Sequence, residues 1–310
     1  MRLSVLDQSP IAEGSTGPDA LRNTIDLARL ADQLGYTRYW VAEHHSGLML
    51  AGPSPEALIG AIASATSRIR VGSGGVMLPH YSPFKVAETF SLLSGLFPSR
   101  IDLGIGRAPG TDPLTMYALQ RDRRDAAPDD FPQQMVELLG YLNGSLPDDH
   151  PFKHLARALP GIPEKPEFWL LGSSHQSAIW ANDLGLNYAF ADFINPEGAD
   201  PADLVCVSAI CADSDAEAER LAASARMAFS MLRSGRPIPV PPVEKALRYL
   251  ENRPPPSGRR AVLGSPETVK RELEAIAKAY NADEVMVVTI VHDHPARRRS
   301  YELIAEAMIE

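Results

Sequence analysis

The sequence lacks any long hydrophobic run, and it also lacks an excess of positive charge. It contains no stretch of about 18 consecutive apolar residues, whereas a transmembrane helix needs about 20, so no membrane span is expected. The formal net charge is −9 at pH 7, whereas a nucleic-acid partner needs a concentrated basic surface. The basic triplet Arg297-Arg298-Arg299 is more simply a solvated helix face. Membranes and nucleic acids are therefore not expected as partners.

Cysteine is almost absent. The only two, Cys206 and Cys211, lie in one apolar run, and along a strand they would be roughly 16 Å apart and point to opposite faces. A disulfide needs Cα atoms within about 7 Å. We therefore expect both thiols to be buried, reduced and structural, which fits a cytoplasmic protein.

What the chain does have is the length and pattern of one large α/β domain spanning residues 1–310. Its composition is 45% hydrophobic and 22% charged, and α/β barrels of more than about 200 residues routinely form a single domain. Short apolar runs alternate with longer segments of helical period, which indicates βαβ units. The runs typical of buried parallel strands are Leu3–Leu6, Tyr39–Ala42, Val71–Leu78, Ile101–Ile105, Phe168–Leu171, Tyr188–Ala191, Val205–Ala212 and Val285–Val291.

These eight runs predict a closed (β/α)₈ TIM barrel, with an open doubly wound sheet as the alternative. Ser54-Pro55, Ser82-Pro83 and Ser265-Pro266 each predict a helix start. At such a start the serine oxygen is expected to accept a free backbone N–H, and proline at the first helical position has no N–H to lose.

Three connections depart from the regular alternation. Residues 107–130 form a long polar loop after the fourth strand, and residues 235–258 hold seven prolines around the helical piece VEKALRYL. Such excursions are usually lids or binding loops, although plain surface insertions would fit equally well. Between the sixth and seventh strands only residues 192–203 are available, so we expect the covering helix to be missing there.

Chemically active residues follow the second predicted strand. The C-terminal ends of barrel strands carry function, and here they bring Glu43, His44 and His45. An acid beside imidazoles can transfer protons near neutral pH. A structural hydrogen-bonded group is the alternative. A metal site is not favoured, because adjacent histidines in an extended chain point in opposite directions.

The next three strand ends carry glycine and anion-binding groups. Gly74-Gly75 lies in a glycine run inside the third strand, which close approach of a flat ring would require, although barrel packing could require it too. Arg107 after the fourth strand suits a phosphate or carboxylate. Gly172-Ser173-Ser174 after the fifth strand precedes a helix, whose free N–H groups can hold an anion. Arg107 and this turn together predict a phosphorylated ligand.

The combination of WVAEHH, VGSGGVMLPH, LGIGRAPG and LLGSS resembles the bacterial luciferase-like flavin monooxygenases, the family of alkanal monooxygenase, particularly its single-chain members. The resemblance implies a catalytic base at His44, with Glu43 as a possible orienter. It places the flavin ring on a cis peptide at Gly74-Gly75. It places the FMN phosphate at Arg107 and Ser174, with Ser173 beside it.

The same resemblance implies an FMN-dependent monooxygenase that uses O₂ and reduced FMN from a separate flavin reductase to oxidise a small organic substrate. It also implies a homodimer, which the apolar second and third helices support. Two alternatives stay open: an F420-dependent oxidoreductase on the same fold, and a non-catalytic flavin-binding relative. Because family members usually carry a helix between the sixth and seventh strands, we expect an open wall there, with exposed apolar surface or a partner covering it.

Overall fold

The computed structural model describes residues 1–45, 47–108, 112–120, 130–196, 198, 200–253 and 261–309. Parallel strands form one sheet that closes on itself, because β7 pairs with β6 on one side and with β9 on the other, and β9 pairs with β1. The strands of this ring are β1 (Arg2–Asp7), β2 (Arg38–Val41), β3 (Arg70–Met77), β4 (Ile101–Gly106), β5 (Glu167–Gly172), β6 (Asn187–Ala191), β7 (Leu204–Cys211) and β9 (Glu284–Val288). The predicted closed barrel is confirmed, and the open sheet is excluded.

The predicted strands agree with the observed ones to within one residue at each end, apart from the last, which ends at Val288 and not at Val291. A further strand, β8 (Val262–Gly264), was not predicted. It pairs with the C-terminal half of β7 and lies outside the ring.

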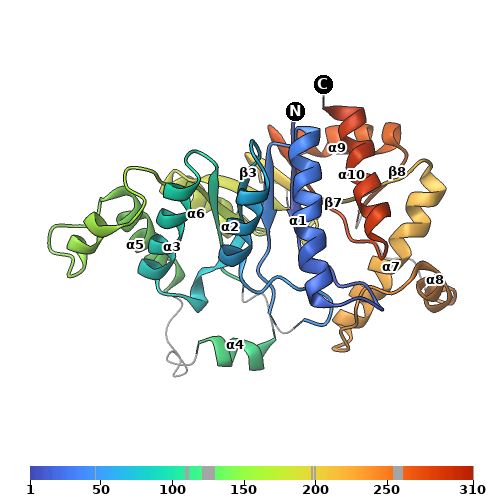
Figure 1. Ribbon diagram of the computed structural model, residues 1–310, viewed down its shortest axis with the longest axis horizontal. Helices are drawn as coiled ribbons and strands as arrows, with labels where there is room; N and C mark the ends of the chain where they lie inside the picture. The colour runs from blue at the N-terminus through green and yellow to red at the C-terminus, as the bar shows by residue number, and fades with distance from the viewer. Residues whose placement is uncertain are drawn as a thin grey trace.

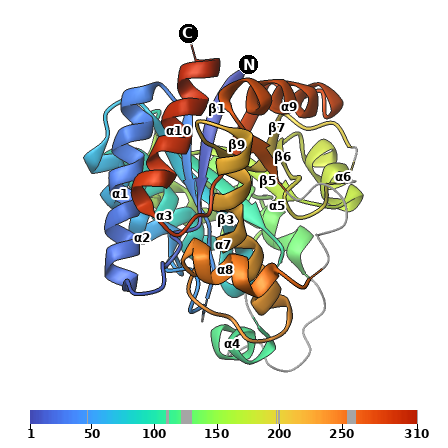
Figure 2. The ribbon, with the colours of Figure 1, turned by 90° about the vertical axis from the view of Figure 1, so that its right-hand side faces the viewer.

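Helices surround the barrel (Figure 1), and the two chain ends lie close together at one end of it (Figure 2). The described helices are α1 (Gly17–Leu34), α2 (Pro55–Ala65), α3 (Pro83–Leu96), α4 (Pro113–Leu119), α5 (Phe131–Asn143), α6 (His175–Leu184), α7 (Asp215–Arg233), α8 (Val243–Leu250), α9 (Pro266–Ala279) and α10 (His294–Met308), with 3₁₀ turns η1 (Leu78–His80) and η3 (Lys153–Ala158). None of them combines the length and the apolar character needed to cross a membrane.

The three Ser-Pro pairs mark helix starts as predicted, but the capping bond does not form. Helices α2, α3 and α9 begin at Pro55, Pro83 and Pro266, and none of the three preceding serine side chains accepts a backbone N–H of its helix. The Ser54 hydroxyl instead donates to the Glu56 carboxylate at 2.6 Å. Proline at the first position thus marks these starts without help from the serine.

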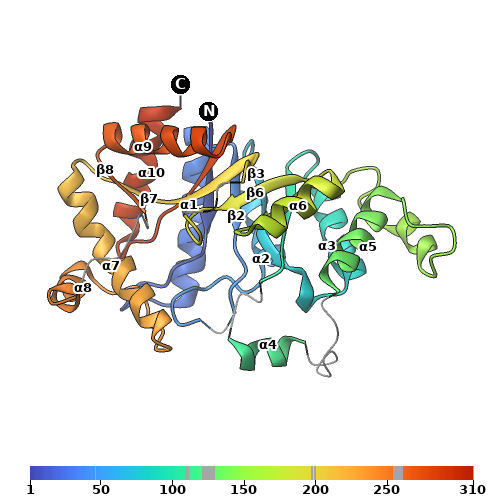
Figure 3. The ribbon, with the colours of Figure 1, turned by 180° about the vertical axis from the view of Figure 1, so that it is seen from behind.

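Both long excursions contain a helix. In residues 107–130 this is α4, which stands apart from the rest of the ribbon at the end where the strands terminate (Figures 1 and 3). In residues 235–258 it is α8, as predicted. Val240 of the same excursion is 0% exposed and packs against the cluster inside the barrel, so this excursion helps to close the barrel mouth. Residues 109–111, 121–129 and 254–258 lie outside the described part.

The described residues between β6 and β7 contain no helix, as predicted. The expectation of an open apolar wall is wrong for the strand itself, because Phe190 of β6 is 0% exposed. Tyr280, which follows α9, stacks on Phe190 with ring centroids 5.0 Å apart, and its hydroxyl donates to Asp192 at 3.0 Å. A neighbouring helix end thus covers the wall in place of the missing helix. Ile194 remains 59% exposed in the loop.

Two minor predictions had different outcomes. Cys206 and Cys211 are buried free thiols, the first in the cluster inside the barrel and the second in the layer beneath the helices, as predicted. The reading of the Arg triplet as a solvated face is wrong for Arg297. This side chain is 2% exposed and donates to the buried Asp7 carboxylate at 2.7 Å. Its charge holds the pKa of Asp7 below the usual value against the opposing effect of burial.

Candidate active site

The predicted site residues lie at neighbouring strand ends. Strands β2, β3, β4 and β5 are consecutive neighbours in the barrel, so the segments that follow them meet at one end of the molecule. The closed barrel therefore places the four predicted groups on one arc of the C-terminal rim.

His44 offers an unsatisfied nitrogen at this rim. Its backbone N–H donates to Gly52 O at 2.9 Å. The residue as a whole is partly exposed, yet its Nδ1 atom is buried and has no hydrogen-bond partner among the described residues. Burial, together with the charge of His45, lowers the pKa of His44 to about 4. The imidazole is therefore neutral at pH 7, and Nδ1 is a buried polar atom whose hydrogen-bonding capacity is unused among the described residues.

The described hydrogen bonds of Glu43 do not include one to His44. Its carboxylate, which is 0% exposed, lies instead against His45, with Oε1 2.6 Å from Nε2. The sequence contained the signal for this contact, because residues two apart in an extended chain point to the same face and adjacent ones do not. Tyr81 Oη and the Met77 backbone N–H also donate to the carboxylate, at 2.9 and 2.8 Å. His45 was singled out from the sequence together with Glu43 and His44, whereas Tyr81 and Met77 were not.

The same cluster brings three metal-ligating side chains together. Ligand atoms of Glu43, His45 and His80 all lie within 4.8 Å of one another. The Glu43 carboxylate already accepts hydrogen bonds from Met77 and Tyr81, and the His45 ring lies at hydrogen-bond distance from it. Burial and the Glu43 charge raise the pKa of Tyr81, so its hydroxyl keeps the proton that it donates. We therefore interpret the cluster as a hydrogen-bonded group.

The peptide between Gly74 and Gly75 is cis, at the position that the family resemblance implied. Barrel packing is sufficient to explain both glycines. A Cβ at Gly74 would lie 2.7 Å from Leu6 Cδ1, and one at Gly75 would lie 2.7 Å from the Gly104 carbonyl oxygen. Contacts this short do not occur in folded proteins, so no side chain fits at either position without movement of its neighbours.

Arg107 contacts α6, the helix that follows the turn after β5. The exposed Arg107 guanidinium packs over the ring of Trp180 on α6, with Cζ 5.4 Å from the ring centroid. Ser174 is the exposed N-cap residue of the same helix. Gly172 is a packing requirement, since a Cβ there would lie 2.0 Å from Ser177 Oγ. The carbonyl oxygen of Ser173 accepts a hydrogen bond from Asn195 Nδ2 at 2.9 Å.

The hydrogen bond from Asn195 to Ser173 connects the loop between β6 and β7 to the turn after β5. Besides the Asn195 contact, Asp200 Oδ1 lies 2.7 Å from Nδ1 of His175, the first residue of α6. The loop that replaces the missing helix thus supports the turn at Gly172-Ser173-Ser174 from the side.

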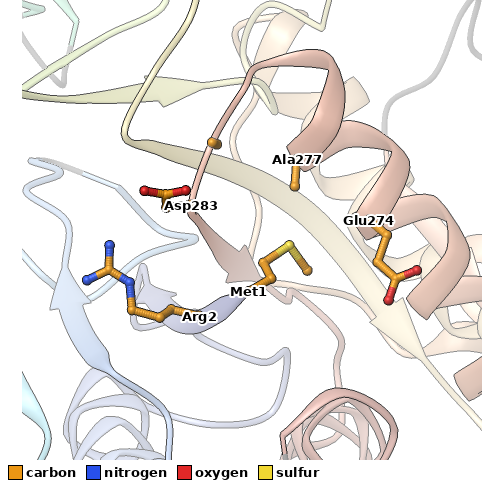
Figure 4. Close-up of a pocket in the computed structure, with 6 residues that line it drawn as sticks. Met1, Arg2, Glu274, Ala277 and Asp283 are labelled. Carbon is orange, nitrogen blue, oxygen red and sulfur yellow. The ribbon is translucent and has the colours of Figure 1, made fainter.

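A pocket lies at the opposite end of the barrel. It is lined by the first residues of the chain, by the segment before β9 and by α9 (Figure 4): Met1, Arg2, Glu274, Ala277, Ala282 and Asp283. Arg2 and Asp283 lie at the N-terminal ends of β1 and β9, whereas the predicted site residues follow the C-terminal ends. The pocket is therefore separate from the predicted site.

A closed parallel barrel with proton-transfer and anion-binding groups on its C-terminal rim is typical of an enzyme. The family model for luciferase-like monooxygenases matches residues 1–284, and the chain belongs to this family. It is 44% identical to the uncharacterized protein YwcH of Bacillus subtilis (strain 168), over 99% of each chain. It is 37% identical to the N-acetyl-S-alkylcysteine monooxygenase of the same organism, over 100% of this chain and 98% of that one. The protein is thus a monooxygenase of the luciferase-like family.

Solved structures share the fold of this chain. The chain superimposes on apo-MsnO8 with a TM-score of 0.89 and 40% identity, over 99% of this chain and 98% of the other. It shares its fold with the oxygenating constituent of 3,6-diketocamphane monooxygenase from Pseudomonas putida, solved in complex with FMN, with a TM-score of 0.73 and 21% identity over 99% and 97%. It also shares the fold of an F420-dependent secondary alcohol dehydrogenase, with a TM-score of 0.65 and 14% identity over 100% and 99%.

Proposed function

We propose that this chain is an FMN-dependent monooxygenase, which uses reduced FMN and O₂ to oxidise a small organic substrate. The observation that carries the proposal is the packing of Arg107 over Trp180 of α6. It brings a guanidinium to the helix whose N-terminus begins at Ser174. A phosphate is recognised by an arginine fork together with a helix N-terminus, and FMN carries such a phosphate.

The remaining rim residues are suited to hold the flavin ring and to transfer a proton. In this proposal the flavin ring lies near Gly74-Gly75, and the neutral His44 presents Nδ1 to accept or return a proton. Bound reduced FMN would supply the electrons with which O₂ is activated. Partly exposed apolar side chains that pack against the interior cluster, Leu171, Phe193 and Phe229, would help to keep water away from the reacting atoms.

The proposal includes two partners. Reduced FMN would come from a separate flavin reductase. The substrate is a small organic molecule, and the related N-acetyl-S-alkylcysteine monooxygenase makes N-acetylated S-alkylcysteines the first compounds to test. Both cysteines are buried free thiols, which agrees with a cytoplasmic location.

Anaerobic titration tests the cofactor. We expect FMN and reduced FMN to bind, and F420 to bind weakly. Admission of O₂ to the reduced complex should then oxidise the substrate. Tight F420 binding with substrate reduction in the absence of O₂ would favour the F420-dependent alternative. Flavin binding without oxygen-dependent turnover of any compound in the panel would favour the non-catalytic one.

The proposal also includes a homodimer formed through α2 and α3. Leu92 and Leu96 of α3 are 48% and 63% exposed, which is high for large apolar side chains on neighbouring helix turns. Contact between copies would bury them. We expect sedimentation at micromolar concentration to give the mass of a dimer, and Leu96→Glu to give a monomer that still folds. A native protein that sediments only as a monomer would contradict this part.

A further inference from the structure

Strand β3 extends beyond its neighbour. The ladder between β2 and β3 ends at the pair Val41–Ser73, whereas β3 continues to Met77. On the other side, the register with β4 shifts between Gly74 and Val76. The segment around Gly74-Gly75 therefore has no β2 ladder on one side and an irregular ladder on the other. A partly buried backbone N–H in such a segment is costly unless it finds another acceptor.

Glu43 supplies that acceptor. Its Oε2 accepts the Met77 N–H at 2.8 Å, where a longer β2 would have offered a carbonyl oxygen. Because the acceptor is a carboxylate, the bond is charge-assisted and stronger than an ordinary ladder bond. The Glu43 side chain thereby continues the β2–β3 ladder past the point where β2 ends.

The carboxylate is itself held from two sides. Its Oε1 accepts a hydrogen bond from Tyr81 Oη at 2.9 Å and lies 2.6 Å from His45 Nε2. Tyr81 follows η1 and His45 follows β2, so the contacts join the segments that leave both strands. With Glu43 0% exposed, each of these contacts compensates for the loss of water around a buried carboxylate.

We propose that Tyr81 and His45 are positioning residues, which hold the Glu43 carboxylate so that it fixes the main chain at Gly74-Gly75 as the seat of the flavin ring. The inference rests on the proposed function, because it assumes that a flavin ring lies at these glycines. It assigns Glu43 to the seat and not to proton transfer with His44. It also separates two parts of one ligand: Arg107 recognises the phosphate, whereas the Glu43 group recognises the ring.

Comparison of FMN with riboflavin distinguishes the two parts, because riboflavin has the ring and lacks the phosphate. The variants are Tyr81→Phe and Glu43→Gln. Tyr141→Phe is the matched control, since Tyr141 on α5 also donates to a carboxylate, that of Glu137, at 2.8 Å. Each protein is titrated with both flavins by fluorescence quenching. Its thermal unfolding is measured without flavin, which reports on folding independently of binding.

We expect Glu43→Gln to weaken FMN and riboflavin by the same factor, about 5–30-fold, and Tyr81→Phe to weaken both by about 3–10-fold. Tyr141→Phe should leave both affinities unchanged. Equal affinities in Tyr81→Phe and the native protein would overturn the inference, and so would a loss confined to FMN. If Glu43→Gln does not fold, Tyr81→Phe alone decides. Failure of the native protein to bind either flavin would refute the proposed function itself, which is a different result.

Discussion

The two ends of the barrel use polar side chains in opposite ways. At the N-terminal end, Arg38 of β2 is 4% exposed and forms ion pairs with Asp102, Glu167 and Glu284 at 2.9–3.2 Å. Asp102 is also paired with Arg70 and accepts the Trp40 indole N–H at 2.8 Å. At the C-terminal end, His44 keeps a buried nitrogen without a described partner, and Arg107 is exposed.

This difference indicates that the polar groups at the N-terminal end stabilise the fold, whereas those at the C-terminal end serve function. Buried charges that are fully paired cannot take up a ligand without breaking existing bonds, and removal of one partner leaves another charge uncompensated. An unsatisfied buried nitrogen costs the fold something, and a guanidinium at the surface can turn toward an anion without removing an ion pair from the interior. Changes at the N-terminal end should therefore affect folding, and changes at the C-terminal end should affect binding and turnover.

The largest expected effect is on turnover. His44→Phe keeps a ring of similar size and removes both nitrogens, so proton transfer by this side chain is lost. Substrate oxidation after admission of O₂ to the reduced complex should slow by about 10²–10⁴-fold. Single-turnover kinetics with the substrate that the oxygen assay identifies provide the measurement. A rate within tenfold of the native value would show that His44 is not the proton-transfer group.

The next effect is on stability, at the opposite end. Asp102→Ala removes a fully buried carboxylate that pairs with both Arg38 and Arg70, which leaves Glu167 as the acid that still contacts both. It should lower the free energy of unfolding by about 3–5 kcal/mol. Urea denaturation measures it. The control is Glu219→Ala, which removes the partner of Arg226 on the exposed face of α7 and should cost less than about 1 kcal/mol. Similar losses in the two variants would contradict the contrast between the buried network and the surface.

A smaller effect is expected on cofactor affinity. Arg107→Ala removes a charge-assisted contact and should weaken FMN by about 1.5–3 kcal/mol, or about 10–150-fold. Arg107→Lys should recover only part of the loss, because an ammonium cannot make a two-pronged contact. Riboflavin, titrated in the same way, should bind the native protein weakly and be almost indifferent to the change. Equal weakening of both flavins would show that Arg107 does not recognise the phosphate.

The barrel could be predicted because its strands are buried on both faces and each is separated from the next by a helix or a loop of readable composition. Strand β8 could not, since three residues ending in Gly264 carry no periodicity. The closure of the barrel wall between β6 and β7 could not be predicted from the sequence either. Tyr280 reaches Phe190 and Asp192 from a helix about 90 residues away in the chain, and no local pattern encodes such a contact.

At the rim, residues within one strand end were easier to predict than contacts between strand ends. The sequence identified Glu43 and His44 and suggested that they act as a pair, whereas the described contact of Glu43 is with the next histidine, His45. Met77 is the last residue of β3, and Tyr81 follows the turn after that strand. Both contact Glu43 only because β2 and β3 are neighbours in the closed barrel. Long-range contacts of this kind depend on strand order and register, which the sequence pattern gave only in outline.

The smallest expected effect concerns pH and tests whether His44 is held neutral. Its folded-state pKa, about 4, lies below the value of about 6.5 expected in the unfolded chain. Between these values the unfolded state binds more protons than the folded one, so stability is greatest above about pH 6.5 and falls as the pH decreases toward 4. Because His44 is partly exposed as a residue, its contribution to the loss of stability between pH 7 and pH 5.5 should be at most about 1 kcal/mol. His44→Gln cannot titrate, so subtraction of its urea unfolding curves from those of the native protein isolates this contribution. A difference that does not change with pH, or one that grows in the opposite direction, would show that the folded protein does not disfavour the charged imidazole.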